Sequence, residues 1–167
     1  MKESSFDQTT PVTLRPVVAE DESFLYRAYA STRADEMALV PWNEAQREAF
    51  LKMQFTAQQQ DYRARHPAAT HDIILLNSIP VGRIFVDRRD QAIHILDITV
   101  LPEHRNKGAG TTLLKRLMSE AADSGKSVTI YVESFNPSCQ LFERLGFLKI
   151  ADEGVNYLME WRAEQVR

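Results

Sequence analysis

The chain has 167 residues, of which 44% are hydrophobic and 26% are charged. Lys and Arg total 20 against 23 Asp and Glu, so the formal net charge is −3. These values fit one globular domain with a hydrophobic core; they exclude a disordered or collagen-like chain and give no reason to expect a broad nucleic-acid-binding surface.

The single cysteine, Cys139, cannot form an intramolecular disulfide, and no Cys/His cluster has the spacing of a zinc site. Residues 1–10 are polar and lack the apolar run of a signal peptide or a membrane span. We therefore expect a flexible N-terminus over residues 1–10, a single domain over residues 11–163 and a cytoplasmic location. We expect no metal, no nucleic acid and no membrane among its ligands.

The first elements are a short strand and two helices. Residues 12–15 alternate apolar and polar side chains as a strand does, and Pro16 ends it. An amphipathic helix follows two acidic residues and ends before Pro41, and a second helix begins at Asn43 and ends before Pro67.

The central part predicts a strand meander followed by a crossover. Residues 72–76, 81–86 and 93–100 are rich in β-branched side chains and are joined by turns, which predicts three consecutive antiparallel strands. Residues 113–122 carry apolar side chains at helical spacing, and residues 128–132 form an apolar strand. The order strand, helix, strand predicts a parallel crossover into the same sheet.

The last part predicts a short helix, opened by Asn136-Pro137 and closed by Gly146, and then two strands at residues 147–150 and 157–161. The complete order is β-α-α-β-β-β-α-β-α-β-β. It predicts an α/β (α+β) fold with one mixed, mostly antiparallel sheet of roughly six to seven strands and about four helices.

A candidate anion site follows the strand at residues 93–100. Gly108 and Gly110 let the backbone approach a ligand closely, and the first amides of the helix that starts here have no partner within the helix. The helix end attracts an exposed anion by about 1 kcal/mol, and Arg105 and Lys107 add donors. Alone, this pattern fits an ordinary turn equally well, and it matches neither the P-loop nor the dinucleotide fingerprint.

A second motif lies one strand downstream, from Asn136 to Phe147, and reads Asn-Pro-Ser-Cys-Gln-Leu-Phe-Glu-Arg-Leu-Gly-Phe. It looks like the Asn-Pro…Leu-Tyr-Glu-x-Leu-Gly-Phe signature of the GNAT superfamily of acetyl-CoA-dependent N-acetyltransferases. The stretch from Arg105 to Gly110 looks like the Arg/Gln-x-x-Gly-x-Gly/Ala signature of the same superfamily. Both motifs occur in the family's order, and the resemblance covers most of the chain.

The resemblance implies the acyl-CoA N-acyltransferase-like fold, with acetyl-CoA as co-substrate between the strands at residues 93–100 and 128–132, which splay apart in the family. It implies a cofactor-binding set made of Ile98, Thr99, Val100, Arg105, Asn106, Lys107, Gly108, Ala109, Gly110, Thr111, Asn136 and Phe142. The main chain near Ile98 and Val100 should hold the pantetheine arm, and the glycine loop should surround the diphosphate. The alternative for Asn136 is a helix cap alone.

Acetyl transfer to an amine requires a base, a stabilised oxyanion and a thiolate leaving group. His94 is the leading candidate base, because an unperturbed imidazole has a pKa near 6.5 and one branch of the family carries histidine there; a structural histidine is the alternative. Asp97 is the second candidate, although it lies opposite His94 on an ideal strand unless a bulge near Ile98 turns it. A backbone amide between Ile98 and Val100 should meet the oxyanion.

The sequence departs from the family at Phe142, where relatives usually carry a tyrosine that protonates the departing thiolate. Water, Cys139 or Tyr131 could replace that hydroxyl, and Cys139 is equally a packed small side chain. Because thiols have a pKa of about 8.5, thiolate is a fair leaving group and we expect catalysis to persist. We expect the ring of Phe142 to pack against the cofactor.

The resemblance places the acceptor amine at the first two helices and the last hairpin. Aromatic and acidic side chains there would suit a cationic amine, but core packing and solvated helix faces explain them equally well. They are Tyr26, Tyr29, Trp42, Phe55, Tyr62, Tyr157 and Trp161, with Asp35, Glu36, Glu44 and Glu48 nearby.

We expect an N-acetyltransferase that transfers the acetyl group to a primary amine of a small molecule, amino acid or peptide by direct transfer in a ternary complex. The alternatives are an acyl-CoA-binding module with little turnover and a protein lysine or N-terminal acetyltransferase. A homodimer is compatible with the sequence, although no residue demonstrates it.

Overall fold

The computed structural model describes residues 11–163. The predicted flexible N-terminus at residues 1–10 lies outside this range. The elements are β1 (Val12–Pro16), α1 (Glu22–Ala38), α2 (Glu44–Arg65), β2 (Thr70–Leu76), β3 (Ile79–Arg88), β4 (Ala92–Val100), α3 (Ala109–Ser124), β5 (Ser127–Glu133), α4 (Ser138–Arg144), β6 (Leu148–Asp152) and β7 (Asn156–Trp161), with single-turn helices η2 (Ala19–Asp21) and η3 (Pro102–His104). The predicted order of strands and α-helices is confirmed.

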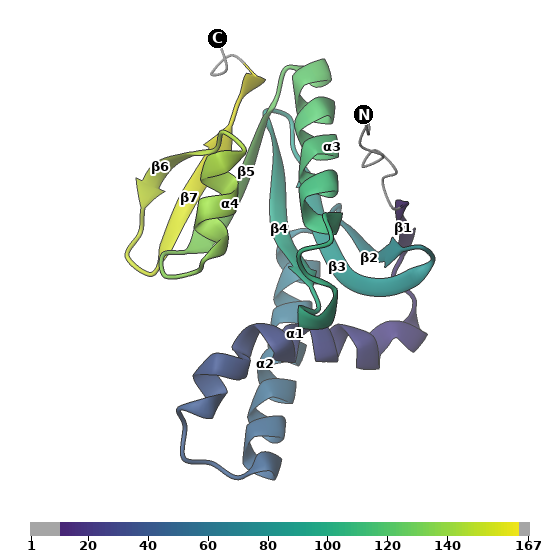
Figure 1. Ribbon diagram of the computed structural model, residues 1–167, viewed down its shortest axis with the longest axis vertical. Coiled ribbons are helices and arrows are strands. Elements are labelled where there is room, and N and C mark those ends of the chain that lie inside the picture. The colour runs from purple at the N-terminus through teal and green to yellow at the C-terminus, as the bar shows by residue number, and fades with distance from the viewer. Residues whose placement is uncertain (1–10, 164–167) are drawn as a thin grey trace, which may run out of the picture.

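The strands form one sheet in the order β1-β2-β3-β4-β5-β7-β6 (Figure 1). Neighbouring strands are antiparallel except β4 and β5, which are parallel. Helix α3 makes the connection between these two strands, so the predicted parallel crossover is confirmed. The crossover places the end of β4 and the start of α3 at the centre of the sheet, which is where the candidate anion site lies.

Helices cover both faces of the sheet (Figure 1). The amphipathic face of α3, which includes Leu113, Leu114 and Leu117, packs with α4 and one face of the strands in the larger hydrophobic core. A smaller core under α1 and α2 includes Leu25 and Phe55. The two helical layers therefore bury the central strands from both sides.

Strand β4 contains a bulge that decides which of its side chains share a face. Its register with β3 shifts so that Leu96 has no partner residue. His94 and Asp97 therefore lie on the same face, toward α1 and α2, while Ile98 packs against the core under α3. A bulge near Ile98 was the condition for Asp97 to share the face of His94, and β4 bulges at Leu96, where the Tyr62 hydroxyl of α2 donates to the Leu96 carbonyl at 3.2 Å.

Within residues 11–163, every helix is too short or too polar to cross a membrane. The cytoplasmic location stays a prediction.

Candidate active site

Strands β4 and β5 are paired over only part of their length. Their parallel register joins Ala92–Ile95 to Ser127–Ile130 and then stops, although β4 continues to Val100. Figure 1 shows the β5, β6 and β7 side diverging from the rest of the sheet at this end. Among residues 11–163, no strand lies beside this edge of the second half of β4.

The polar groups along this edge of β4 point away from β3. The Leu101 amide donates to the Val81 carbonyl at 2.8 Å, and alternate residues of a strand direct their polar groups to opposite sides. The main chain of Ile98 and Val100 therefore faces β5. The Val100 carbonyl accepts the Arg105 Nε at 2.9 Å, which leaves the Val100 amide and both polar groups of Ile98 for a ligand extended like a strand.

The start of α3 presents a row of backbone amides. Asn106 and Gly108 have positive φ angles of 63° and 85°, a conformation that glycine adopts without strain, and the Thr112 amide is the first to bond back, to the Gly108 carbonyl at 2.9 Å. No backbone acceptor among residues 11–163 meets the amides from Gly108 to Thr111. No atom lies within 4 Å of the position that a Gly110 side chain would take. Such a row at a positive helix end suits a diphosphate.

Two of the predicted cofactor-binding side chains are engaged inside the chain. The Thr99 hydroxyl donates to Asp97 Oδ1 at 2.9 Å on the α1 and α2 face, so only its main chain is available at the β4 edge. The Asn136 Oδ1 accepts the Ser138 amide at 2.8 Å, just before α4, so this side chain already has a partner within the chain. Its predicted contact with pantetheine stays a prediction.

Phe142 lies in the hydrophobic core rather than at the surface. Its side chain is 3% exposed and meets Phe147 edge-on, with ring centroids 5.3 Å apart. The structure therefore assigns Phe142 to packing between α4 and the sheet. Its contact with the cofactor stays a prediction.

Asp97 belongs to a buried polar network. Its Oδ2 forms an ion pair with Arg83, whose side chain is 1% exposed, and its Oδ1 accepts the Thr99 hydroxyl. Arg83 also donates to Gln58 of α2 at 2.8 Å. Both carboxylate oxygens of Asp97 are thus engaged by neighbouring side chains, which favours a structural role.

His94 is buried beside the point where β4 and β5 part. Its Nδ1 lies 2.8 Å from the Thr129 hydroxyl, and the Tyr131 ring packs edge-on against the imidazole at a centroid distance of 5.7 Å. Burial lowers the pKa of His94 to about 4. The expected unperturbed pKa near 6.5 is therefore wrong for this environment, and the imidazole is a free base at neutral pH.

Two histidines, the buried His94 and the partly buried His71, predict an acid-sensitive fold. Burial also lowers the pKa of His71 to about 4, so the unfolded chain binds protons at both histidines between roughly pH 6.5 and 4 that the folded chain does not. The unfolding free energy should therefore fall as the pH drops through this window, by up to about 1.4 kcal/mol per pH unit for each ring, and less where solvent screens it. Urea titrations at several pH values measure this slope.

The variants His94→Gln and His71→Gln should each flatten the slope, because neither glutamine titrates. His104→Gln, in the single-turn helix η3 after β4, is the matched histidine replacement outside these two positions. An unaltered slope in both His94→Gln and His71→Gln would show that other groups cause the acid sensitivity.

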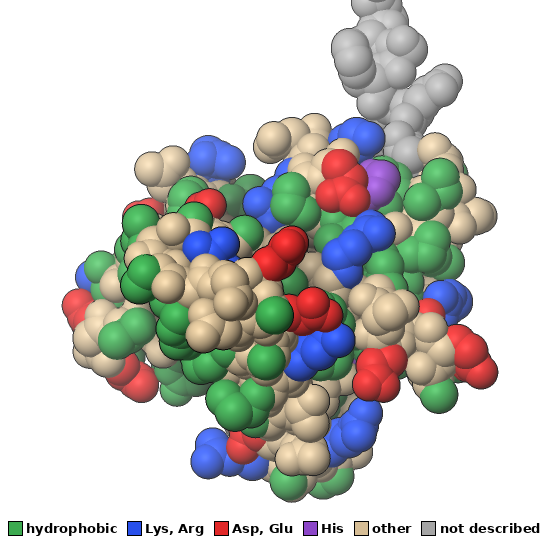
Figure 2. All heavy atoms as spheres, turned by 90° about the horizontal axis from the view of Figure 1, so that it is seen from below, with side chains coloured by type: hydrophobic (Ala, Val, Ile, Leu, Met, Phe, Trp, Pro, Cys, Tyr) green, Lys and Arg blue, Asp and Glu red, His purple; other side chains and the backbone are tan. Residues whose placement is uncertain are grey.

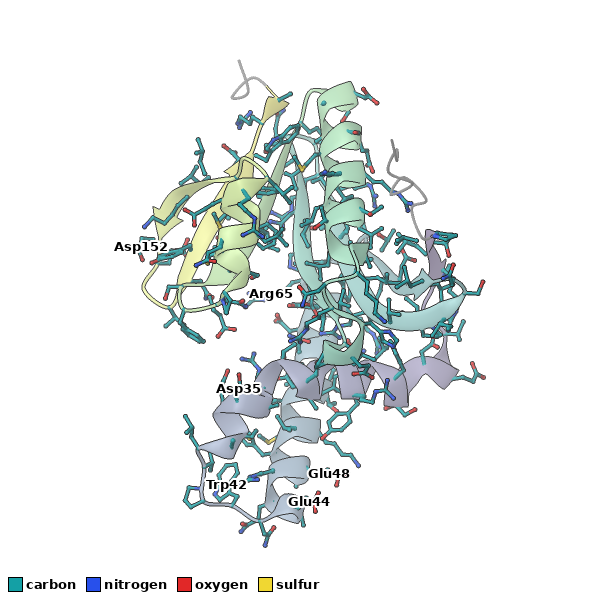
Figure 3. The ribbon with its side chains drawn as sticks, viewed as in Figure 1. Asp35, Trp42, Glu44, Glu48, Arg65 and Asp152 are labelled. Atoms are coloured by element: carbon teal, nitrogen blue, oxygen red, sulfur yellow. The ribbon has the colours of Figure 1, made fainter. Side chains whose placement is uncertain are left out.

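The aromatic residues proposed for the acceptor site are largely packing residues. Tyr26 and Tyr29 contact Phe55, and Trp42 contacts Phe50 at a centroid distance of 5.2 Å. Figure 3 shows Trp42, Glu44 and Glu48 together at the end of the α1 and α2 hairpin, away from the sheet. Acidic and basic side chains are interspersed over the face seen from below in Figure 2.

Comparisons with known proteins show the family of the chain. Residues 27–147 match the sequence family described as the acetyltransferase (GNAT) family. The chain is 26% identical over 102 residues to a Bacillus subtilis protein named uncharacterized N-acetyltransferase CgeE, covering 54% of this chain and 39% of that protein. It is 38% identical over 60 residues to an N-alpha-acetyltransferase of Saccharolobus solfataricus, covering 34% of this chain and 36% of that protein.

The fold resembles the crystal structure of the PaiA N-acetyltransferase from Thermoplasma acidophilum in complex with coenzyme A. The TM-score is 0.69 at 18% identity, covering 91% of this chain and 99% of that one. The described residues contain no group of three or more His, Cys, Asp or Glu side chains that could hold a metal ion. Because the family match spans residues 27–147, which is most of the chain, the protein belongs to the GNAT acetyltransferase family.

Proposed function

We propose that the protein is an N-acetyltransferase that transfers the acetyl group of acetyl-CoA directly to a primary amine of a small molecule, amino acid or peptide. The observation that carries this proposal is the continuity of two unpaired main-chain surfaces. The β4 edge at Ile98 and Val100 leads, through a short loop, to the row of free amides from Gly108 to Thr111. An extended arm that ends in a diphosphate matches both surfaces.

In this proposal the loop and helix start, Arg105, Asn106, Lys107, Gly108, Ala109, Gly110 and Thr111, hold the diphosphate. The exposed Lys107 adds charge, and the Arg105 guanidinium is held beside the strand by its bond to Val100. The main chain from Ile98 to Val100 pairs with the pantetheine arm, and an amide of this segment stabilises the oxyanion.

His94 is the proposed base. A neutral imidazole is ready to accept a proton at physiological pH, but its lowered pKa makes it a weak acceptor. It therefore suits removal of the proton from the amine after attack, when the bound acyl group has made that nitrogen more acidic. The hydroxyl of Thr129 orients the ring.

The variant Gly110→Asp tests the binding site. The free protein should be as stable as the wild type or more so, because the new side chain enters open space and an acidic group at a helix start favours the helix by about 0.3–1 kcal/mol. Acetyl-CoA affinity should fall by about tenfold or more, because the carboxylate would face the diphosphate. Calorimetry and thermal unfolding with and without acetyl-CoA measure the two effects.

Gly110→Asn is the matched control, since it adds nearly the same volume without the charge. Wild-type thiol release from acetyl-CoA, followed across a panel of primary amines, tests transfer itself. Equal affinity in Gly110→Asp and the wild type would place the diphosphate elsewhere.

Two other functions have specific support. The buried Phe142 lacks the acidic hydroxyl that the family resemblance leads one to expect, which favours an acyl-CoA-binding module with little turnover. The relative named an N-alpha-acetyltransferase favours a protein N-terminus as acceptor. Acetyl-CoA binding without thiol release for any amine or peptide would support the first, and release with peptides alone would support the second.

A further inference from the structure

Tyr131 occupies a particular place on β5. It is the first residue beyond Ile130, the last β5 residue that pairs with β4. Its ring packs edge-on against His94, so it stands on the same face as the proposed base. The side chain is 48% exposed, whereas His94 beneath it is 6% exposed. Tyr131 therefore borders the start of the unpaired β4 edge from the opposite strand.

The hydroxyl of Tyr131 has no hydrogen-bond partner among residues 11–163. Two other tyrosines near this face use theirs: Tyr62 donates to the Leu96 carbonyl, and Tyr29 donates to Gln54 at 3.3 Å. Those bonds hold α2 on the sheet and on α1. The hydroxyl of Tyr131 serves no such contact, and its half-exposed position leaves it free to meet a bound molecule.

The other candidates for a proton donor are engaged or lack a proton to give. Phe142 carries no hydroxyl and is 3% exposed. The Cys139 thiol points to the Glu133 carbonyl at 3.5 Å and is only partly exposed. Of the two residues that the sequence offered in place of Phe142, Tyr131 alone combines a free hydroxyl with exposure beside the parting strands.

We infer that Tyr131 is the proton donor to the departing coenzyme A sulfur, in the role that Phe142 cannot fill. This inference rests on the proposed function. The amine nitrogen forms a bond to the acetyl carbon, and the bond between that carbon and sulfur then breaks. Its electron pair goes to sulfur, which takes the hydroxyl proton of Tyr131 to give the free thiol. The amine loses its proton to His94 and solvent, and solvent returns one proton to the tyrosine oxygen.

The test uses Tyr131→Phe in the full chain, with the amine that the wild type acetylates fastest. The turnover number should fall by about 100-fold, the lower range for loss of a general acid, while acetyl-CoA affinity stays within about twofold. A second measurement needs no acceptor: the wild type should bind coenzyme A more tightly than desulfo-coenzyme A. Tyr131→Phe should lose that preference, because the preference depends on a hydrogen bond to sulfur.

Ser124→Ala, which removes a hydroxyl at the C-terminal end of α3, is the control and should retain both properties. Cys139→Ala should also retain turnover. Full turnover in Tyr131→Phe, or a large loss in Cys139→Ala alone, would overturn this inference and leave the proposed function standing. A wild type that binds no acetyl-CoA, or binds it without thiol release, would overturn the proposed function and the proton donor together.

Discussion

Replacing Asp97 with alanine should lower the free energy of unfolding by about 3–5 kcal/mol, because it leaves a buried arginine without its counter-charge. Arg83 is 1% exposed, and its only carboxylate partner among residues 11–163 is Asp97. The hydroxyl of Thr99 loses its acceptor in the same variant. Urea denaturation at neutral pH gives the difference directly.

Two further variants show that the cost comes from burial. Glu120→Ala breaks an exposed ion pair with Arg88, in which the side chains are 43% and 41% exposed, and should cost at most about 1 kcal/mol. The double variant Arg83→Met/Asp97→Leu removes both charges and should recover most of the lost stability. If Asp97→Ala unfolds like the wild type but has lost turnover, Asp97 is a catalytic carboxylate and the structural role is wrong.

The order of the elements and the position of the glycine loop before α3 could be predicted, because local sequence patterns determine both. Proline and glycine mark the ends of elements, and apolar spacing separates strands from helices. The loop before α3 has its glycine where the backbone needs a positive φ, at Gly108. The order strand, helix, strand that begins at residues 93–100 then determines the parallel crossover.

The side-chain network around β4 could not be predicted, because it depends on contacts between distant segments. The Leu96 bulge is held by Tyr62, which lies 34 residues earlier in the sequence, and only that bulge brings Asp97 to the face of His94. Arg83 belongs to no motif and lies within the apolar run at residues 81–86. An arginine in the middle of such a run indicates a charged partner on a neighbouring element.

The pKa of His94 could not be predicted from the sequence either, because it also depends on contacts between distant segments. The expectation near 6.5 assumed contact with water, whereas Tyr131 and neighbouring elements bury the ring. Burial is a property of the assembled sheet rather than of the strand that carries the histidine.

Gly82→Ala should cost about 3 kcal/mol or more, at the upper end of the range for overpacking, because the obstacle is backbone rather than a flexible side chain. A Cβ at this position of β3 would lie 2.1 Å from the Thr99 carbonyl oxygen and 3.0 Å from the Val100 Cα. The end of β4 must therefore move away from β3. That same segment carries the Val100 amide proposed to hold the pantetheine arm, so acetyl-CoA affinity should fall as well.

Gly154→Ala is the matched control for Gly82→Ala, since nothing lies within 4 Å of its would-be side chain and only the φ angle of 84° opposes the substitution. It should cost about 1 kcal/mol and leave acetyl-CoA affinity unchanged. Equal losses of stability in the two variants would show that β3 and β4 do not approach as closely as the structure places them. Acetyl-CoA affinity should be measured well below the unfolding temperature of Gly82→Ala. If this variant is destabilised but keeps full affinity, the end of β4 does not take part in acetyl-CoA binding.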